Sequence, residues 1–419
     1  MSKIVVNGGA KLKGELRVGG AKNAVLPILA GTLLSTGCVT LTDCPDILDA
    51  GNMMSILRTL GADTNKSFDV LDIRTKDASC FIMPSHLSKE LRSSIFMLGP
   101  ILSRFKRARC VYPGGCEIGN RPIDLHLSGL SMLNVKILEK HGSIICDGSD
   151  MRGNTIHLDY PSVGATENLM MAAVTAKGKT EVQNAAREPE IEDLQTFLNE
   201  LGYSVHGAGT STVIINGTDG ISDKSVVHKI IPDRIVAGTF LTAAAITGGE
   251  INLKNCIPSH LSSIIAKLRE TGCDIEVNDD SIRLSVNREL KEIRHLETLP
   301  HPGFPTDMQA PIFALCCVLN GTSIIVENVF ENRFKHASEL AKMGAEYTQK
   351  DRMAIIRGVK KLTGASLIAG DLRGGAALVL AGLVAEGETT IDNAELIDRG
   401  YERIDEQLRN IGANIRRID

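Results

Sequence analysis

The chain has 419 residues, of which 43% are hydrophobic and 23% are charged, and its formal net charge is −4. This length exceeds one ordinary hydrophobic core, so two domains are expected, and the acidic balance argues against a general nucleic-acid-binding protein. The N-terminus lacks a charged segment followed by an apolar stretch of signal-peptide length, and no apolar run approaches the roughly 18 residues of a membrane span. The sequence therefore predicts a soluble cytoplasmic protein with no membrane or nucleic-acid partner.

In chain order, the first recurring feature is an apolar helix followed by a short strand. Copies of this pattern span residues 21–41, 166–182, 234–253, 305–326 and 373–391, and a looser copy begins at Leu91. Each copy is followed by an amphipathic helix with apolar residues at i, i+3, i+4 and i+7, as at Leu194, Phe197, Leu198 and Leu201.

Glycine, or once asparagine, ends each amphipathic helix, as a left-handed C-terminal cap requires. These positions are separated by 68 to 73 residues and are Gly61, Asn134, Gly202, Gly272, Gly344 and Gly412. Six units of strands and two helices predict an α/β protein, with three units per domain and a break near residues 218–229. The alternative, one large α/β sheet, would not explain the regular spacing.

Cys116 lies on a segment rich in glycine and proline, Tyr112 to His126, which predicts an exposed loop. A free cysteine has a pKa near ~8.5, and cationic neighbours such as Arg121 lower it and favour the reactive thiolate. The alternative is an inert loop thiol. The other nine cysteines lie in apolar runs without a zinc-type spacing, which is typical of free thiols in a reducing compartment.

Several basic residues stand at or near the expected helix starts. Gly19 and Gly20 precede Lys22 and Asn23, and a helix N-terminus beside a lysine can bind an anion, although a plain turn between domains fits equally well. Guanidinium groups bind phosphate and carboxylate in a bidentate way, but most surface arginines are only solvated. The arginines at such positions are Arg92, Arg234, Arg333, Arg373 and Arg399.

Asp307 precedes an apolar helix, where it can be an ordinary helix cap or a catalytic base. No phosphate-binding loop, dinucleotide-binding glycine motif, zinc-protease motif or nucleophile elbow occurs. The sequence therefore predicts neither a metal nor an organic cofactor.

With the residues described above, the sequence resembles the UDP-N-acetylglucosamine 1-carboxyvinyltransferases, which are enolpyruvyl transferases of the EPSP synthase superfamily. The resemblance runs from about Lys3 to Ile418 and includes GAKNA (20–24), the loop with Cys116, RPIDLH (121–126), NAAREPEI (184–191), HPGFPTDMQA (301–310) and IDRGYERI (397–404). It implies a two-domain inside-out α/β barrel of six βαβαββ-type repeats, three per domain. Residues 22–230 would form one domain, residues 1–21 and 231–419 the other, and the active site would lie in the cleft between them.

The resemblance also implies a reaction: transfer of the enolpyruvyl group of phosphoenolpyruvate to the 3-hydroxyl of UDP-N-acetylglucosamine, with release of phosphate, as the first committed step of peptidoglycan synthesis. Cys116 would protonate the methylene carbon, form a covalent phospholactoyl adduct and react with fosfomycin, and Asp307 would take the hydroxyl proton. Lys22, Arg121 and Arg399 would bind the phosphate and carboxylate of phosphoenolpyruvate, supported by Arg333 and Arg373. The nucleotide sugar would contact Asn23, Arg92, Pro122, Ile123, Asp124, Leu125, Ser162, Val163, Gly164, Thr306 and Val329.

Two positions depart from the pattern of this family, because Leu48 and Tyr160 stand where many relatives have lysine. Both belong to the nucleotide side, so they bear on diphosphate affinity rather than on the reaction and are compatible with a second paralogue. Two rival functions remain: the sister reaction on shikimate 3-phosphate, whose enzymes lack the cysteine loop, and a catalytically idle paralogue that binds the nucleotide sugar.

Overall fold

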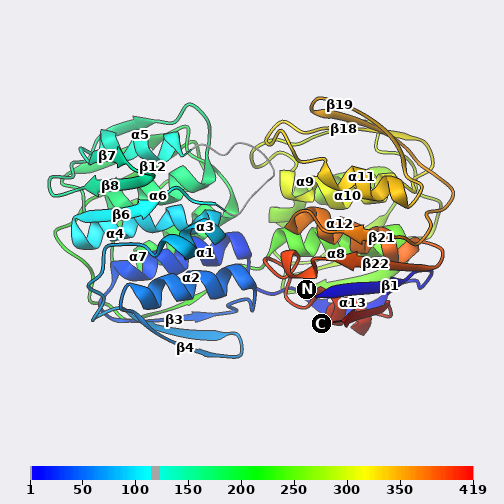
Figure 1. Ribbon diagram of the computed structural model, residues 1–419, viewed down its shortest axis with the longest axis horizontal. Coiled ribbons are helices and arrows are strands. Elements are labelled where there is room, and N and C mark those ends of the chain that lie inside the picture. Colours follow the sequence, from blue (N-terminus) through cyan, green and yellow to red (C-terminus); the bar gives the residue numbers. More distant parts are fainter. Residues whose placement is uncertain (1, 115–122, 419) are drawn as a thin grey trace. The chain divides into compact units, whose positions relative to one another are not determined.

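The computed structural model describes residues 2–114 and 123–418, which fold into two compact units. The terminal unit consists of residues 2–19 and 232–418, and the central unit consists of residues 20–114 and 123–231. Both chain termini lie on the terminal unit (Figure 1).

The core of the central unit consists of apolar helices whose residues are almost all buried. They are α1 (Lys22–Gly31), α4 (Leu98–Phe105), which continues η2 (Arg92–Met97), and α6 (Val163–Ala173). The amphipathic helices α2 (Leu48–Thr59), α5 (Asp124–Met132) and α7 (Pro189–Glu200) each bury one face. Two short helices, η1 (Thr32–Leu34) and α3 (Ser85–Glu90), complete the helices described in this unit.

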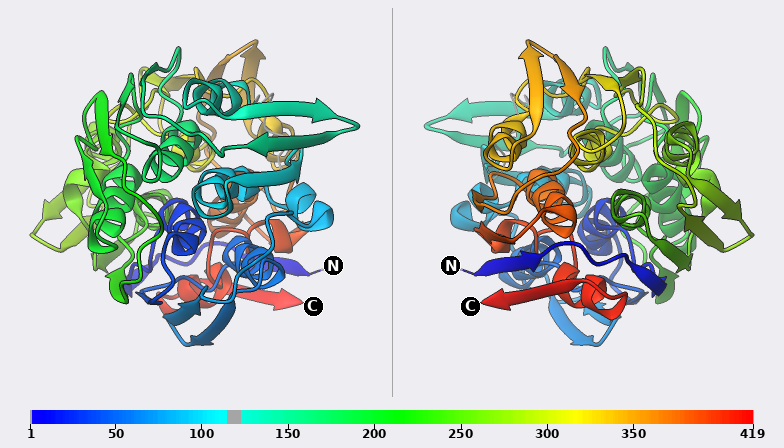
Figure 2. Two further views of the ribbon diagram at one scale, coloured as in Figure 1. Left: turned by 90° about the vertical axis from the view of Figure 1, so that its left-hand side faces the viewer. Right: turned by 90° about the vertical axis from the view of Figure 1, so that its right-hand side faces the viewer.

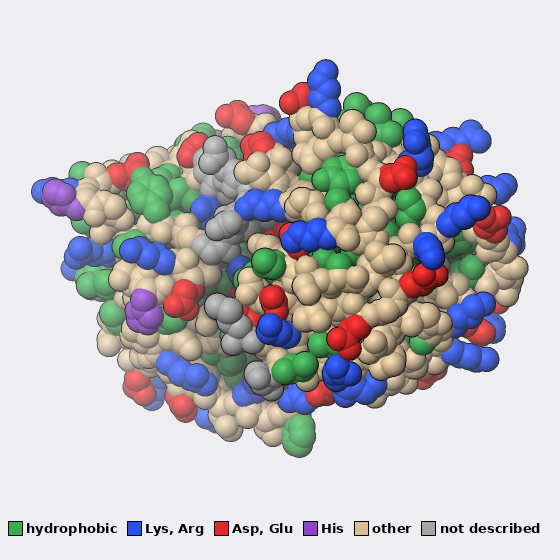
Figure 3. Space-filling view, turned by 45° about the vertical axis from the view of Figure 1, so that its right-hand side comes forward, with side chains coloured by type: hydrophobic (Ala, Val, Ile, Leu, Met, Phe, Trp, Pro, Cys, Tyr) green, Lys and Arg blue, Asp and Glu red, His purple; other side chains and the backbone are tan. Residues whose placement is uncertain are grey.

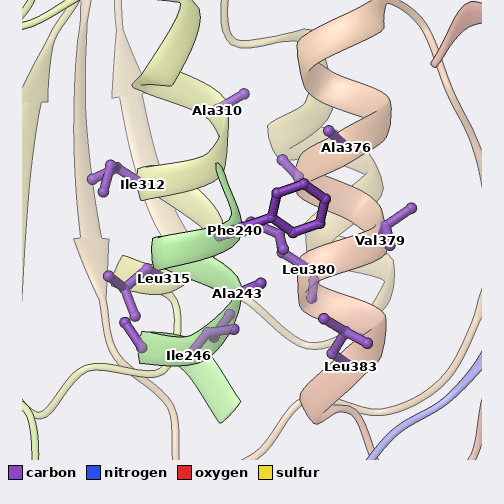
Figure 4. Close-up of a cluster of buried hydrophobic side chains, with 14 of the residues drawn as sticks. Phe240, Ala243, Ile246, Ala310, Ile312, Leu315, Ala376, Val379, Leu380 and Leu383 are labelled. Atoms are coloured by element: carbon purple, nitrogen blue, oxygen red, sulfur yellow. The ribbon is translucent and has the colours of Figure 1, made fainter. Parts of the chain in front are cut away.

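The terminal unit repeats this plan. Its apolar helices are α8 (Arg234–Thr247), α10 (Gln309–Cys316) and α12 (Leu372–Val384), and its amphipathic helices are α9 (Ser262–Thr271), α11 (Lys335–Lys342) and α13 (Ile404–Asn410). Short helices η3 (Pro258–Leu261), η4 (Thr306–Met308) and η5 (Ala394–Leu396) lie in its loops. Phe240 of α8 points toward Ala376 and Leu380 of α12, where the small alanine leaves room for the ring (Figure 4).

The described strands form six sheets, three in each unit. The sheets of the central unit have the orders β13-β3-β5-β4, β6-β8-β7 and β11-β12-β10-β9, and those of the terminal unit β15-β16-β14-β2, β17-β18-β20-β19 and β21-β22-β1-β23. The strands of the central unit are β3 (Cys38–Thr42), β4 (Asp63–Ser67), β5 (Val70–Arg74), β6 (Arg107–Val111), β7 (Lys136–Lys140), β8 (Ser143–Asp147), β9 (Thr155–His157), β10 (Lys179–Gln183), β11 (Ser204–His206), β12 (Thr212–Asn216) and β13 (Val226–Lys229). Those of the terminal unit are β1 (Lys3–Asn7), β2 (Lys13–Arg17), β14 (Glu250–Lys254), β15 (Asp274–Val277), β16 (Ser281–Ser285), β17 (Leu296–Glu297), β18 (Thr322–Val326), β19 (Glu346–Lys350), β20 (Met353–Arg357), β21 (Ser366–Ile368), β22 (Glu388–Asp392) and β23 (Asn414–Ile418).

In each unit the helices lie in the middle and the strands lie around them (Figure 2). A sheet with one face on buried helices and one face in water needs alternating side chains, and β5 and β8 show this alternation of buried and less buried residues. The predicted α/β class with an inside-out arrangement of helices and sheets is confirmed.

Two strands belong to the sheet of another repeat. β2 precedes α1 in the chain but pairs in parallel with β14 of the terminal unit, and β13 precedes α8 but pairs in parallel with β3 of the central unit. The N-terminal strand β1 also lies between β22 and β23, antiparallel to both, and so completes the last sheet. These non-local pairings join each crossing segment of the chain to the unit that it leaves.

The predicted helix ends are confirmed in all six repeats. Each of the six predicted positions has a positive φ, from 65° at Asn134 to 104° at Gly272. At Gly61 the backbone N–H donates to the carbonyl of Arg58 at 3.0 Å, and the N–H of Ala62 donates to Leu57 at 3.0 Å, which is the Schellman motif. The same pair of hydrogen bonds recurs at the other five positions.

A buried histidine anchors β13 shortly before the chain leaves the central unit. Nε2 of His228 lies 3.2 Å from Oδ1 of Asp193, and Nδ1 lies 2.8 Å from Oε2 of Glu200. Burial lowers the pKa of His228, but hydrogen bonds and charge from the two carboxylates outweigh it, so the pKa is raised. His228 and the two carboxylates therefore attach β13 to α7.

We expect this stabilisation to depend on pH. A group whose pKa is raised by folding contributes fully below its unfolded pKa, about 6.5 for histidine, and the contribution is lost as pH rises through the folded value. The unfolding free energy of the wild type should therefore exceed that of His228→Gln more at pH 6 than at pH 9, measured by denaturant titration. His206→Gln, which alters an exposed residue of β11, is the control, and a gap for His228→Gln that is equal at both pH values would contradict the prediction.

Candidate functional site

In the terminal unit an aspartate stands at the start of each apolar helix, but the three aspartates differ in their hydrogen bonds. Oδ1 of Asp233 accepts from the N–H groups of Ile235 and Val236 at 2.8 and 2.9 Å, and so caps α8. Asp371 caps α12 in the same way. Asp307 lies inside η4, and the cap positions of η4 and α10 are Pro305 and Met308, so Asp307 is not a helix cap.

The carboxylate of Asp307 is instead held between two buried arginines. Nη2 of Arg333 donates to Oδ1 at 2.7 Å, and Nη2 of Arg373 donates to Oδ2 at 3.1 Å. The arginine side chains are 3% and 2% exposed, whereas that of Asp307 is 25% exposed. Burial opposes the charge of Arg373, but Tyr401, Asp307 and Asp233 outweigh it and raise its pKa. Asp307 is therefore a partly accessible carboxylate with fixed orientation.

The two arginines keep further donors that the described residues do not satisfy. Nε of Arg333, and Nε and Nη1 of Arg373, have no hydrogen-bond acceptor among the described residues. Buried charged donors are costly unless paired, so these donors add to the cost of burying the two arginines. The exposed Arg283 differs, because it forms a surface ion pair with Glu250 at 2.6 Å. On the face shown in Figure 3, lysine and arginine are interspersed with aspartate and glutamate.

Thr306 and Val329 are brought together by Glu327, a residue that the sequence analysis missed. The hydroxyl of Thr306 donates to Oε2 of Glu327 at 3.0 Å, and Oε1 accepts from the N–H groups of Val329 and Phe330 at 2.8 and 3.1 Å. Glu327 is fully buried directly after β18. An acidic residue that ends an apolar strand is the signal that could have identified it.

Arg399 lies between η5 and α13 and is half-buried. Two residues later, the hydroxyl of Tyr401 is 2.9 Å from Oγ1 of Thr239, and its ring centroid is 5.1 Å from Cζ of Arg373. The segment that carries Arg399 thus contacts the arginine that holds Asp307. Asp307, Arg333, Arg373 and the Arg399 segment form one group in the terminal unit.

In the central unit, Lys22 begins α1 and forms a buried ion pair. Its Nζ is 2.7 Å from Oδ2 of Asp49 in the first turn of α2, and the two side chains are 11% and 2% exposed. Asn23 follows on α1 and is half-buried. The structure requires glycine at position 20, since a Cβ there would clash with the backbone oxygen of Asp43. Lys22 is thus a fixed cation at a helix N-terminus, where an anion is favoured.

The predicted nucleotide-binding residues occupy the starts of α5 and α6. Oγ of Ser162 accepts from the N–H of Ala165 at 3.3 Å and caps α6. A Cβ on Gly164 would lie 2.9 Å from the ring of Phe96 and 3.2 Å from that of His126 on α5, so this contact requires glycine. The starts of both helices therefore lie close together, and they carry Ile123, Asp124, Leu125, Ser162, Val163 and Gly164.

Arg92 holds the first residues of the predicted cysteine loop, whereas the last three residues of that predicted loop, Asp124 to His126, instead begin α5. Its Nη1 donates to the carbonyl of Pro113 at 3.2 Å, and the N–H of Gly114 donates to the carbonyl of Ser88 at 3.2 Å. The predicted residues Cys116, Arg121 and Pro122 lie outside the described residues. The two departures from the family pattern, Leu48 and Tyr160, are both exposed.

The nine described cysteines are free thiols, and seven of them are buried. Burial raises the pKa of Cys110, Cys146, Cys256 and Cys316 to about 12.

Within residues 2–114 and 123–418, no group of three or more histidine, cysteine, aspartate or glutamate side chains is arranged to hold a metal ion. No described helix is long and apolar enough to cross a membrane.

The sequence profile of the EPSP synthase family, described as 3-phosphoshikimate 1-carboxyvinyltransferase, matches residues 6–408. The chain belongs to this family. It is 49% identical over 418 residues to UDP-N-acetylglucosamine 1-carboxyvinyltransferase 2 of Caldanaerobacter subterraneus subsp. tengcongensis, and the alignment covers 100% of both chains. It is 46% identical over 420 residues to UDP-N-acetylglucosamine 1-carboxyvinyltransferase of Myxococcus xanthus, covering 100% of this chain and 99% of the relative. The resemblance found in the sequence is confirmed.

Two solved structures share the fold of this chain. The enolpyruvyl transferase NikO from Streptomyces tendae has a TM-score of 0.89 at 24% identity, covering 99% of this chain and 98% of its own. EPSP synthase from Acinetobacter baumannii has a TM-score of 0.76 at 18% identity, and the alignment covers 100% of both chains. At these identities the comparison establishes the architecture alone.

Proposed function

We propose that the protein transfers the enolpyruvyl group of phosphoenolpyruvate to the 3-hydroxyl of UDP-N-acetylglucosamine, with release of phosphate, in the first committed step of peptidoglycan synthesis. The observation that carries the proposal is the 46–49% identity, over the whole chain, to relatives named for this reaction. The two units are proposed to be the two catalytic domains, with boundaries near residues 22 and 230. We also propose a cytoplasmic location, because free thiols are typical of a reducing compartment.

Asp307 is proposed as the base of the addition step. The 3-hydroxyl oxygen attacks C2 of phosphoenolpyruvate, its proton passes to Asp307, and Cys116 delivers a proton to C3. Arg333 and Arg373 keep the carboxylate in place, since each donates one hydrogen bond to a different oxygen. In the elimination step C3 gives a proton to the Cys116 thiolate, and the electron pair of that C–H bond forms the new C2–C3 double bond. The bond between C2 and the phosphate oxygen breaks, so that the enol ether and phosphate are the two products.

Cations are proposed to bind the two anionic groups of phosphoenolpyruvate. Lys22, Arg121 and Arg399 bind the phosphate and carboxylate, because cations beside the reacting groups stabilise the charge that develops in the transition state. The nucleotide sugar is proposed to contact Asn23 and Arg92, the starts of α5 and α6, and Thr306 with Val329. Glu327 supports the last two, because it binds the hydroxyl of one and the N–H of the other.

One experiment separates the proposed function from the two rival functions. Phosphate release is measured with phosphoenolpyruvate and either UDP-N-acetylglucosamine or shikimate 3-phosphate, because the family profile bears the name of the shikimate reaction. With phosphoenolpyruvate present, we expect phosphate release with UDP-N-acetylglucosamine and none with shikimate 3-phosphate. Release only with shikimate 3-phosphate would assign the sister reaction, and no release with either acceptor at saturation would leave an idle paralogue that binds the nucleotide sugar.

Cys116 should be the cysteine that reacts fastest with fosfomycin. Burial raises the pKa of Cys110, Cys146, Cys256 and Cys316 to about 12, so these four thiols resist ionisation. Peptide mapping by mass spectrometry after labelling identifies the site, and a label on Cys256 or Cys316 would contradict the prediction. Cys116→Asp should abolish labelling but keep turnover, because a carboxylic acid can also donate a proton.

A further inference from the structure

One guanidinium group binds both ends of the segment that carries Arg399. The segment runs from Asp398 to Asp405, and Arg417 of β23 contacts both of these carboxylates. Its Nη1 and Nη2 donate to Oδ2 and Oδ1 of Asp398, each at 2.7 Å, and its Nε donates to Oδ1 of Asp405 at 3.2 Å.

All three nitrogen atoms of the Arg417 guanidinium group donate hydrogen bonds in this arrangement. The bidentate pair with Asp398 fixes the orientation of that carboxylate as well as its distance, which a lysine ammonium could not do. Asp405 is 5% exposed at the start of α13, and the side chain of Arg417 is 21% exposed, so the contacts are partly shielded from water. The charges of both carboxylates outweigh burial and raise the pKa of Arg417.

The middle of the segment is held separately. Tyr401 is 1% exposed, and its hydroxyl is 2.9 Å from Oγ1 of Thr239 on α8. Asp398 directly precedes Arg399, and Tyr401 follows it by two residues. The backbone on both sides of Arg399 is therefore attached to β23 and to α8, so the place of Arg399 depends on these contacts.

We propose that Arg417 is a positioning residue for Arg399: by binding Asp398 and Asp405 together, it holds Arg399 where it can bind the anionic group of phosphoenolpyruvate. The proposal rests on the proposed function for the role of Arg399. It adds Arg417 on the last strand to the residues on which substrate affinity depends. Arg417 itself does not bind substrate.

The test compares Arg417→Lys and Arg417→Gln with Arg416→Gln. Lysine keeps the charge but loses the bidentate fork, and glutamine loses both. Arg416 is the matched control, since it lies on the same strand, its side chain is 58% exposed, and its ion pair with Glu388 at 3.3 Å is on the surface. The measurements are KM for each substrate, kcat, and hydrogen exchange of the peptide containing residues 397–403.

We expect KM for phosphoenolpyruvate to rise about 10-fold in both Arg417 variants, while KM for UDP-N-acetylglucosamine stays within about 2-fold. Amide exchange in residues 397–403 should be faster in both Arg417 variants and unchanged in Arg416→Gln. Asp398→Asn weakens the fork from the other side and should change the same KM in the same direction. If Arg417→Gln does not fold, the KM and exchange measurements on Arg417→Lys are sufficient for the test.

Unchanged exchange and unchanged KM in the Arg417 variants would overturn the proposal. An equal rise of both KM values would also overturn it, because that result indicates a general structural role. If the wild type itself transfers no enolpyruvyl group, the proposed function fails, whereas the exchange measurement still decides whether Arg417 holds the segment.

Discussion

Replacement of Asp307 by asparagine is expected to lower kcat by about 10²- to 10⁴-fold, the usual contribution of a general base. An amide cannot take the proton of the sugar hydroxyl, and its single oxygen can accept from only one of Arg333 and Arg373, which donate to different oxygens of Asp307. A helix cap would tolerate this substitution, since asparagine caps as well as aspartate, but Asp307 occupies no cap position. The measurement is steady-state phosphate release at saturating concentrations of both substrates.

The same variant should also lose some stability. Asparagine removes the negative charge that faces two buried guanidinium groups, which should cost about 1–3 kcal/mol in the free energy of unfolding. Asp274→Asn is the control, because it alters an exposed ion pair with Arg288 and should change neither quantity appreciably. Normal kcat in Asp307→Asn would show that Asp307 is not the base.

Lys22→Met is the second substitution with a large expected effect. Loss of a fixed cation that binds the phosphate or carboxylate should lower kcat/KM for phosphoenolpyruvate by about 10²- to 10³-fold. The substitution also takes the ion-pair partner from Asp49, whose side chain is 2% exposed, and breaking a buried pair from one side costs about 3–5 kcal/mol. Kinetics and denaturant unfolding of the same preparation measure both effects.

A double substitution separates binding from stability. Lys22→Met with Asp49→Leu removes the whole pair and should recover most of the lost unfolding free energy, because apolar residues can replace a buried pair at little cost. Activity should not return, since the cation is still missing. Lys66→Met, which alters a pair with the exposed Asp46 at 2.6 Å, is the control. Recovery of activity in the double variant would mean that Lys22 acts only in folding.

Much of the candidate site could be named from the sequence because the chain contains long phrases that resemble the enolpyruvyl transferases. An acidic residue after an apolar strand marks Glu327 as a candidate, but its role could not be derived from the sequence, because that role depends on the hydroxyl of Thr306, 21 residues earlier, which only the fold brings to it. The choice between cap and base at Asp307 was also open in the sequence. Local spacing is the same for both, whereas the two arginines that orient the carboxylate are 26 and 66 residues away.

Local conformation was determined by the sequence itself. Gly61, Asn134 and their four counterparts end helices because a left-handed φ is costly for most other residues, and this preference acts within a few residues of chain. Partner choice was decided only by the tertiary structure. β2 and β13 pair with strands outside their own repeats, and Arg417 binds Asp398 and Asp405, because parallel pairing and ion pairs depend on distances that close only when separate segments pack.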